Sequence, residues 1–239
     1  MVHSAYLKRT LLAASLALGF SGAALAAPSY GNIAPPGVYF GTGNINGNWT
    51  IDTANNVEVA LRAKNRGTGA TIDGSSGIYS SAQGLCNPAC TGGSKAKWNY
   101  ELSVNTKANG AGPLTLSDII VQLSVDTDPS AGTSFTVLNA LTQWGDTEFW
   151  NGSSKRIGGA PAMGEFVAQQ SENPLFGGTG FGFLPGPGLY DFVLTAFDKA
   201  GAVLASVHTQ VQVIPEPSSM ALVGLALFGV AALGKRRPS

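Results

Sequence analysis

Residues 95–105 read KAKWNYELSVN, and this stretch decides the fold class. The apolar residues of the stretch occupy every second position, namely Ala96, Trp98, Tyr100, Leu102 and Val104. A period of two places successive side chains on opposite faces of an extended strand, so the pattern predicts a β-strand with one buried face. Trp98 belongs to the apolar set and is expected in the core.

The same alternation recurs along the chain, in residues 57–64, 119–125, 190–194 and 203–213. Asn55 and Asn56 are expected to turn residues 49–53 onto residues 57–64, and residues 198–201 (DKAG) to join the last two strands as a hairpin. Six to nine short antiparallel strands predict an all-β fold, an antiparallel β-sandwich, with a partly closed β-barrel as the alternative. Residues 68–93 and 145–187 show little regular pattern, and the second region is expected to form a long surface loop.

The composition fits this fold class and argues against a nucleic-acid partner. Glycine supplies 32 of the 239 residues, roughly twice its usual share, which favours short strands and turns over long helices. Residues 27–214 contain nine basic and thirteen acidic side chains. A mildly acidic domain without a basic stripe is a poor match for a phosphate backbone.

The residues needed for several common mechanisms are scarce. His208 is the only histidine after residue 3, and it occupies a polar position of the last strand, where we expect it to be exposed. The sequence contains no Gly-x-Ser-x-Gly elbow that would supply a nucleophile. A single imidazole also cannot form a multi-histidine zinc site. We therefore expect no enzyme activity and no cofactor.

Cys86 and Cys90 are the only cysteines, and three residues separate them. A thioredoxin-like redox motif has two intervening residues and begins a helix, which this glycine- and serine-rich stretch does not favour. In an exported chain we expect the pair to form a disulfide across a small loop.

The carboxylates offer two further hypotheses. Asp126, Asp128 and Ser130 begin like a calcium loop, but Ala131 and Val137 occupy the positions of its glycine and closing glutamate. An irregular calcium site that includes Asp118, Asp146 or Glu148 remains open, although a solvated turn is the preferred interpretation. The same carboxylates could form a glycosidase pair only at a defined separation, which a sequence does not give.

Three aromatic residues lie near predicted turns: Trp144, Phe149 and Trp150. Tryptophans in such positions commonly anchor a loop, which is the preferred interpretation. The alternative is a platform on which a carbohydrate stacks.

The first 26 residues are typical of a signal peptide. Lys8 and Arg9 precede an apolar run from Leu11 to Phe20, and Ala24-Leu25-Ala26 matches the small-x-small pattern of a cleavage site. We expect cleavage between Ala26 and Ala27, followed by an ectodomain of residues 27–214.

The C-terminal part, residues 215–239, resembles the PEP-CTERM sorting signal of Gram-negative bacteria. Its segment Pro215-Glu216-Pro217-Ser218-Ser219 precedes an apolar span and a basic tail, residues 235–239, with Lys235, Arg236 and Arg237. We expect a transmembrane helix over residues 219–234, with the basic tail kept in the cytoplasm. The resemblance implies processing by an exosortase, an integral membrane enzyme, and delivery from the inner membrane to the cell surface or the exopolysaccharide matrix.

The sequence thus predicts an exported, non-catalytic protein of the cell surface or extracellular matrix. The expected partners are an exosortase and, before processing, the inner membrane. An exopolysaccharide-binding module that uses Trp144, Phe149 and Trp150 is the alternative, and a glycoside hydrolase is a more distant third.

Overall fold

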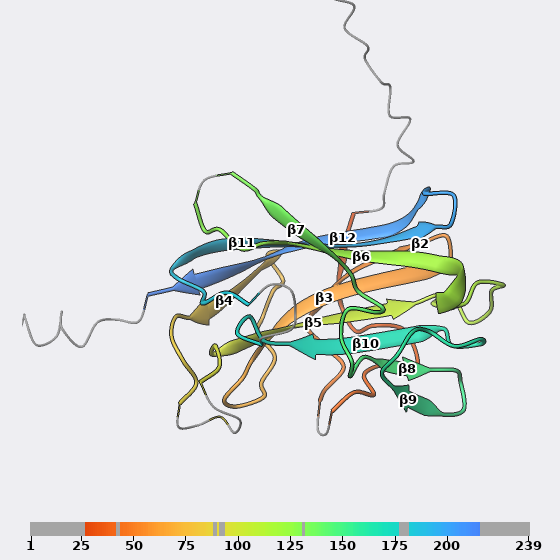
Figure 1. Cartoon of the computed structure of the whole chain (residues 1–239), viewed down its shortest axis with the longest axis horizontal. Helices are drawn as coiled ribbons and strands as arrows, with labels where there is room; N and C mark the ends of the chain where they lie inside the picture. Colours follow the sequence, from red (N-terminus) through yellow and green to blue (C-terminus); the bar gives the residue numbers. More distant parts are fainter. Residues whose placement is uncertain are drawn as a thin grey trace, which may run out of the picture.

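The computed structural model describes residues 27–41, 44–87, 90, 94–130, 132–176 and 182–215. These residues form two β-sheets that face each other across a common core (Figure 1). The seven-stranded sheet, called sheet A, has the strand order β1-β2-β3-β5-β10-β8-β9. The five-stranded sheet B has the order β4-β12-β11-β6-β7. Both sheets are open, as in the predicted sandwich and not in a closed barrel.

Sheet A comprises β1 (Ser29–Gly31), β2 (Trp49–Ala54), β3 (Val57–Asn65), β5 (Trp98–Asn105), β8 (Glu148–Trp150), β9 (Lys155–Ile157) and β10 (Val167–Glu172). Sheet B comprises β4 (Ile78–Ala82), β6 (Ile119–Asp126), β7 (Phe135–Asn139), β11 (Gly188–Asp198) and β12 (Val203–Ile214). One 3-10 turn, η1 (Leu116–Asp118), leads into β6.

The main core lies between the sheets and uses the apolar positions that the alternation predicts. Leu61 of β3 and Leu102 of β5 face Leu123 of β6 in one cluster of buried residues. The Trp98 ring is 1% exposed and meets the Phe192 ring of β11 edge to face, with centroids 6.0 Å apart. The prediction that Trp98 belongs to the core is therefore confirmed.

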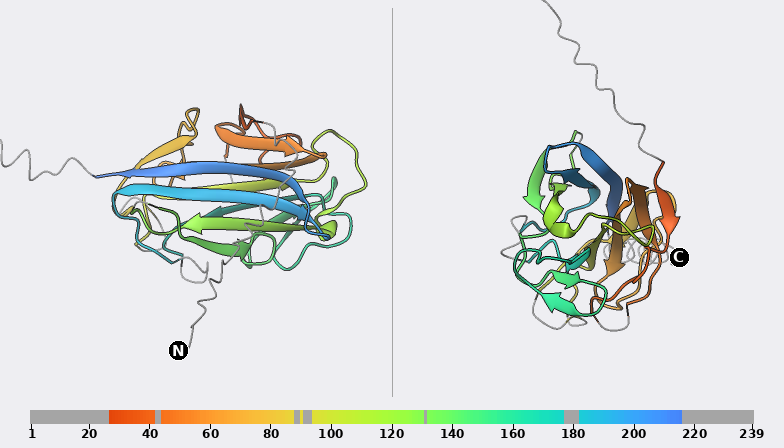
Figure 2. Two further views of the ribbon diagram at one scale, coloured as in Figure 1. Left: turned by 90° about the horizontal axis from the view of Figure 1, so that it is seen from above. Right: turned by 90° about the vertical axis from the view of Figure 1, so that its right-hand side faces the viewer.

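The two predicted turns are also confirmed. Asn55 and Asn56 both have positive φ, 52° and 63°, and join β2 to β3 in a two-residue hairpin turn, a conformation that asparagine tolerates better than most residues. The longest strands, β11 and β12, form the second hairpin, which Figure 2 shows as the blue pair along the sandwich. The Asp198 carboxylate accepts hydrogen bonds from the amides of Ala200 and Ala202 in its turn.

The prediction of a long surface loop over residues 145–187 is wrong in part. This region contains β8, β9 and β10, and β10 lies inside sheet A between β5 and β8. Its sequence, VAQQSE, lacks apolar alternation because Gln169, Gln170 and Glu172 are buried on the two faces of the strand. A buried strand built from amides and a carboxyl has no period-two signal.

Two strands outside the predicted set complete sheet B. β7 is an edge strand, and β4, within the weakly patterned residues 68–93, pairs with β12 in the parallel direction. The sandwich is therefore mixed and not purely antiparallel as predicted. A five-residue partner at the sheet edge is too short to show a clear alternation.

A further difference concerns the outer face of sheet A, which the alternation predicts to be solvated. Residues 32–41 and 44–48, called the strap, cover this face and bury its polar side chains. Trp49, Ile51 and Ala60 form a second apolar cluster with Ile33 and Phe40 of the strap. Polar side chains of sheet A beneath or beside the strap are less than 6% exposed: Glu58, Arg62, Glu101, Ser103, Asn105 and Gln169.

The strap is bound through its backbone, because the buried side chains hydrogen-bond its peptide groups. Both Glu58 carboxylate oxygens accept from the Ala34 amide at 3.0–3.1 Å. The Arg62 guanidinium donates to the carbonyls of Ile45 and Gly47, at 2.9 and 2.8 Å. Gln169 accepts from the Tyr39 amide and donates to the Gly37 carbonyl. Burying these polar side chains without hydrogen-bond partners would cost free energy. The strap supplies those partners, and the side chains in turn hold the strap on sheet A.

Candidate functional site: an aromatic groove beside Trp150

The three aromatic residues of the predicted platform do not form one surface. Phe149 is fully buried and Trp144 is 5% exposed, and both belong to the main core. Trp150 follows Phe149 in β8 and points to the opposite, outer face of sheet A, as successive strand residues must. Trp150 alone of the three therefore offers part of its ring to a ligand at the surface.

Trp150 lines a groove of about 370 Å³ at the end of sheet A. This volume falls within the roughly 300–1,000 Å³ typical of small-molecule and cofactor sites. The lining comes from four separate parts of the chain: Pro35 and Pro36 of the strap, Lys107, Ala108 and Gly110 after β5, Trp150 and Gly152 at the end of β8, and Phe166 directly before β10.

Backbone hydrogen bonds fix the two aromatic residues of the groove. The Phe166 amide donates to the Trp150 carbonyl at 2.9 Å, and the Phe166 carbonyl accepts from the Thr106 amide at 2.8 Å. Gly152 has φ +99°, and a Cβ on it would lie 3.3 Å from Phe166 Cε1. The glycine therefore allows both the turn after β8 and the position of the Phe166 ring.

The wall formed by residues 107–110 is held by the side chain of Asn56. Its carboxamide oxygen accepts from the Asn109 amide at 2.9 Å, and its amide group donates to the Ala111 carbonyl at 2.6 Å. On the strap side, Asn105 donates to the Pro35 carbonyl at 3.0 Å. The Tyr39 ring lies 6.0 Å from the Trp150 ring between centroids. These contacts give the groove a fixed shape on both sides.

Lys107 is the charged residue of the groove lining. Its ammonium nitrogen lies 4.7 Å from the centroid of the Phe166 ring, within cation–π range. Sequence inspection did not identify Lys107 or Phe166, since neither lies in an alternating segment or a known motif. Trp150 was the one signal in the sequence that led to this groove.

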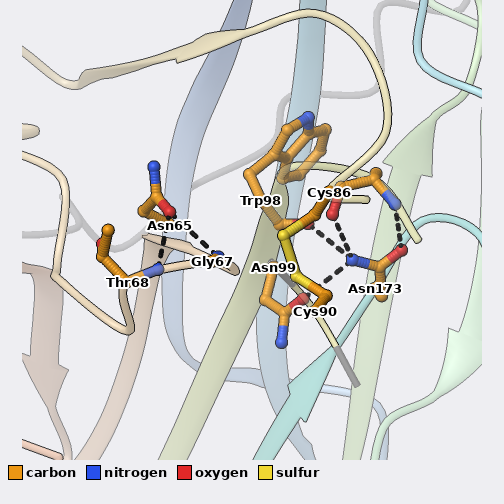
Figure 3. The surroundings of a disulfide bond; sticks show 9 residues. Asn65, Gly67, Thr68, Cys86, Cys90, Trp98, Asn99 and Asn173 are labelled. Atoms are coloured by element: carbon orange, nitrogen blue, oxygen red, sulfur yellow. Dashed lines mark hydrogen bonds between the residues drawn. A yellow bond between two sulfur atoms is a disulfide. The ribbon is translucent and has the colours of Figure 1, made fainter. Parts of the chain in front are cut away.

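The predicted disulfide is confirmed. Cys86 and Cys90 are bonded, with Cα atoms 5.5 Å apart, and Figure 3 shows the bond together with Asn173, the residue after β10. The Cys86 amide donates to the Lys95 carbonyl at 2.8 Å, which attaches the loop to the residues before β5. A ring of five residues contributes only about 2 kcal/mol by loop entropy, so the bond mainly stiffens this loop.

His208 lies on the exposed face of sheet B, as predicted. Its Nε2 atom is 2.5 Å from the Asp191 carboxylate of the neighbouring strand, and the Gln210 side chain donates to the same oxygen at 2.9 Å. These contacts account for the imidazole as one member of a surface cross-strand pair.

The carboxylates considered for calcium have separate partners. Asp126 accepts from the Asp128 amide in a turn, and Asp118 accepts from Thr115. Asp146 accepts from Gln170, and Glu148 pairs with Lys155 at 2.8 Å. Across the part of the chain that the structure describes, no three potential metal-ligating side chains come together.

Glu172 is the carboxyl group with the most unusual environment. It is 3% exposed on the inner face of β10, opposite Tyr100. Burial raises the pKa of Glu172 to about 8, the negative charge of Asp146 adds to the rise, and Arg66 opposes it. The Glu172 carboxyl group is therefore neutral at physiological pH and packs in the interior in that form.

This shift predicts a pH-dependent stability that Glu172→Gln removes. Between the ordinary pKa of 4.5 and about 8, the unfolded chain releases this proton and the folded chain retains it, so stability falls as pH rises. At pH 9 we expect the variant to have a free energy of unfolding about 1–3 kcal/mol above wild type. Urea unfolding of the full-length chain in detergent measures this difference. Below pH 4.5 the two proteins should converge, and equal stabilities at pH 9 would contradict the assignment.

The predicted terminal residues fall mainly outside the described residues. Ala24 and Ala26 precede them, and the motif residues Glu216 to Ser219, the helix predicted at 219–234 and the basic residues Lys235, Arg236 and Arg237 follow them. Ala27 and Pro215 are described, and both are exposed. None of the helical segments among the described residues has the length and hydrophobicity needed to span a bilayer.

Strand β12 connects the sandwich directly to the C-terminal segment. Val213 is 2% exposed and belongs to the main core, and the Ile214 carbonyl accepts from the Gln83 amide at 2.8 Å. The folded domain therefore extends to the residue before Pro215. No curated protein matches the chain in sequence. The PEP-CTERM protein-sorting motif matches residues 213–237, and this match identifies the chain as a PEP-CTERM protein.

Proposed function

We propose that the chain is a non-catalytic protein of the cell surface or extracellular matrix and that its sandwich binds exopolysaccharide. The sorting motif implies export and processing by an exosortase, and we propose residence in the inner membrane before processing. The observation that carries the binding role is the groove beside Trp150, where two aromatic rings and two prolines form a fixed apolar wall.

Several properties of the groove support binding in preference to hydrolysis. A pyranose ring has apolar C–H faces, which suit an aromatic wall, and polar edges, which suit a cationic rim. Glycoside hydrolysis commonly uses a pair of carboxyl groups on either side of the scissile bond, and the residues that line this groove include no aspartate or glutamate.

The Trp150→Ala variant tests this proposal. Removing one stacking ring should weaken binding of the cell's own purified extracellular polysaccharide by about 1–3 kcal/mol, on the scale known for bases stacked on aromatic side chains. This corresponds to a rise in Kd of about 5- to 150-fold. Affinity electrophoresis of the full-length chain in detergent, with polysaccharide in the gel, measures the change.

Phe135→Ala is the matched control, since Phe135 is an exposed aromatic residue of β7 in sheet B, 41% exposed and outside the groove. It should bind like wild type. Unaltered migration of the wild-type chain in polysaccharide would argue against a binding function. Equal losses in both variants would argue against this groove as the binding site.

A further inference from the structure

We propose that the groove selects acidic polysaccharide, in which a ring carboxylate pairs with Lys107 while the sugar face stacks on Trp150. This inference rests on the proposed binding function and adds the chemical class of the ligand. It concerns a carboxylate-bearing pyranoside polymer, because the geometry supplies one cation beside two aromatic rings.

Within the described part of the chain, the Lys107 ammonium group contacts an aromatic ring and not a carboxylate. It lies over the Phe166 ring at 4.7 Å, and no aspartate or glutamate of the described residues forms an ion pair with it. The aromatic face attracts one side of the ammonium group without neutralising its charge. Its remaining N–H groups can therefore donate to an anion that enters the groove.

The cations on the strands of sheet A differ from Lys107, because they already pair with carboxylates. Arg62 and Lys64 both contact the Glu101 carboxylate, at 2.6 and 3.0 Å. Lys155, which lies opposite Trp150 in the β8–β9 pair, contacts Glu148 at 2.8 Å. A charged ligand at the groove would meet these cations already paired, so Lys107 is the cation available for recognition.

The groove lining carries a positive charge in a negatively charged domain. Among the residues that the structure describes, Lys107 is the single charged one that lines the groove, in a domain of residues 27–214 with thirteen acidic and nine basic side chains. Attraction of an anion here is short-ranged and sensitive to salt, since screening acts over about 10 Å at 0.1 M ionic strength.

The groove combines this cation with flat apolar surfaces. Phe166 holds Lys107 at the rim while Trp150 and the prolines supply flat apolar surface in the same groove. A polymer that uses both features needs an apolar face and an anionic edge within the same monomer unit. A uronate unit has this form, whereas a simple polyanion without ring faces uses only the charge.

The test compares one polymer in two forms. The full-length chain in neutral detergent is titrated calorimetrically with fragments of the cell's extracellular polysaccharide, before and after reduction of carboxylates to alcohols. We expect the reduction to raise Kd by at least about fivefold, as loss of a charged hydrogen bond would. Lys107→Gln should bind both forms with the weaker affinity, and Lys107→Arg should restore the preference.

Lys95→Gln is the matched control. Lys95 also lies 4.7 Å over an aromatic ring, that of Phe176, but it precedes β5 whereas Lys107 follows that strand. This variant should retain the wild-type preference for the carboxylated polymer. A loss of preference in Lys95→Gln equal to that in Lys107→Gln would overturn the assignment to the groove.

The remaining outcomes separate this inference from the proposed function. Equal, Trp150-dependent binding of both polymer forms would overturn the acidic-ligand inference and leave polysaccharide binding intact. Failure of either form to bind would overturn both proposals. Polyglutamate serves as a polyanion without sugar rings, and affinity equal to that of the polysaccharide would overturn recognition of a saccharide.

Discussion

Arg62→Met is expected to lower the free energy of unfolding by about 3–5 kcal/mol, the cost of breaking a buried ion pair by removing one partner. Arg62 Nε lies 2.6 Å from Glu101 Oε2, and both side chains are 0% exposed. Methionine has a similar apolar stem but supplies no charge, so the Glu101 carboxylate would lose its closest partner within the protein.

The loss extends beyond the ion pair, because the same guanidinium binds the strap. It donates to the Ile45 and Gly47 carbonyls and lies 4.2 Å over the Trp49 ring. Without these contacts, two backbone carbonyls lose their donors, and the strap loses a central attachment to sheet A. We therefore expect the variant to expose the strap to proteolysis as well as to unfold at lower urea.

Lys155→Met is the matched control. Lys155 also pairs with a glutamate, at 2.8 Å, but its side chain is 39% exposed. Exposed ion pairs contribute about 0–1 kcal/mol, so this variant should unfold close to wild type. Urea unfolding of the full-length chains in detergent, followed by circular dichroism, gives the comparison.

The double variant Arg62→Met with Glu101→Gln should recover part of the stability, because it removes the buried carboxylate that Arg62→Met leaves with Lys64 as its remaining charged partner. If Arg62→Met lowers the free energy of unfolding as little as Lys155→Met does, the buried ion pair does not stabilise the strap on sheet A.

The sequence predicted the core-facing side of the strands well, because the alternating pattern lies within each strand. Trp98 and Leu102 alternate with polar neighbours, and this pattern alone identifies the face that packs on sheet B. The Asn55-Asn56 turn is likewise visible in the sequence, since its conformation depends on two adjacent residues.

The outer face was predicted incorrectly because its burial depends on distant residues. Arg62 and Glu101 resemble solvated positions of an amphipathic strand, and only the strap of residues 32–41 and 44–48 converts them to buried ones. Its contacts use backbone groups such as the Ala34 amide and the Ile45 carbonyl. Any sequence carries these groups, so they leave no residue pattern to detect.

The groove could not be predicted as a site for a similar reason. Its walls come from segments separated by more than 100 residues in the sequence, from Pro35 to Phe166. Trp150 was identified as an aromatic residue near a turn, but Phe149 and Trp144 have the same description and lie in the core. The direction of each side chain follows from the position of β8 in sheet A, which the sequence did not reveal.

The second large effect is expected in sorting. A variant with Pro215, Glu216 and Pro217 replaced by alanine should be exported and lose its signal peptide, yet remain unprocessed in the inner membrane and fail to reach the surface. The apolar span and the basic residues Lys235, Arg236 and Arg237 are unchanged in this variant. These features are sufficient in principle for anchoring by hydrophobicity and charge.

The reason for the processing defect is the chemistry of the three replaced residues. Two prolines disfavour helix directly before the span, and Glu216 is the only charged residue of the segment. Alanine would allow a helix to extend toward the sandwich and would remove that charge. An enzyme that recognises an extended, acidic segment at the membrane surface would lose its substrate.

The end of strand β12 shows where a control chain should be truncated. Strand β12 ends at Ile214 and pairs with β4 up to this residue, Ile214 lying opposite Ala82. A chain truncated after Ile214 therefore keeps every strand of the sandwich and lacks the whole segment from Pro215 onward. We expect it to be exported, folded and released without anchoring, which separates a sorting defect from a folding defect.

Membrane fractionation with an epitope in the exposed hairpin turn at Lys199 and Ala200 compares wild type, the triple-alanine variant and the truncated chain. The triple-alanine protein should accumulate in the inner-membrane fraction at the size of the tail-bearing form, while wild type is shortened and leaves that fraction. Cleavage and surface delivery of the triple-alanine protein at wild-type levels would show that the Pro-Glu-Pro segment is not the recognition element. The C-terminal segment would then act as an ordinary membrane anchor, and the dependence on an exosortase would have to be abandoned.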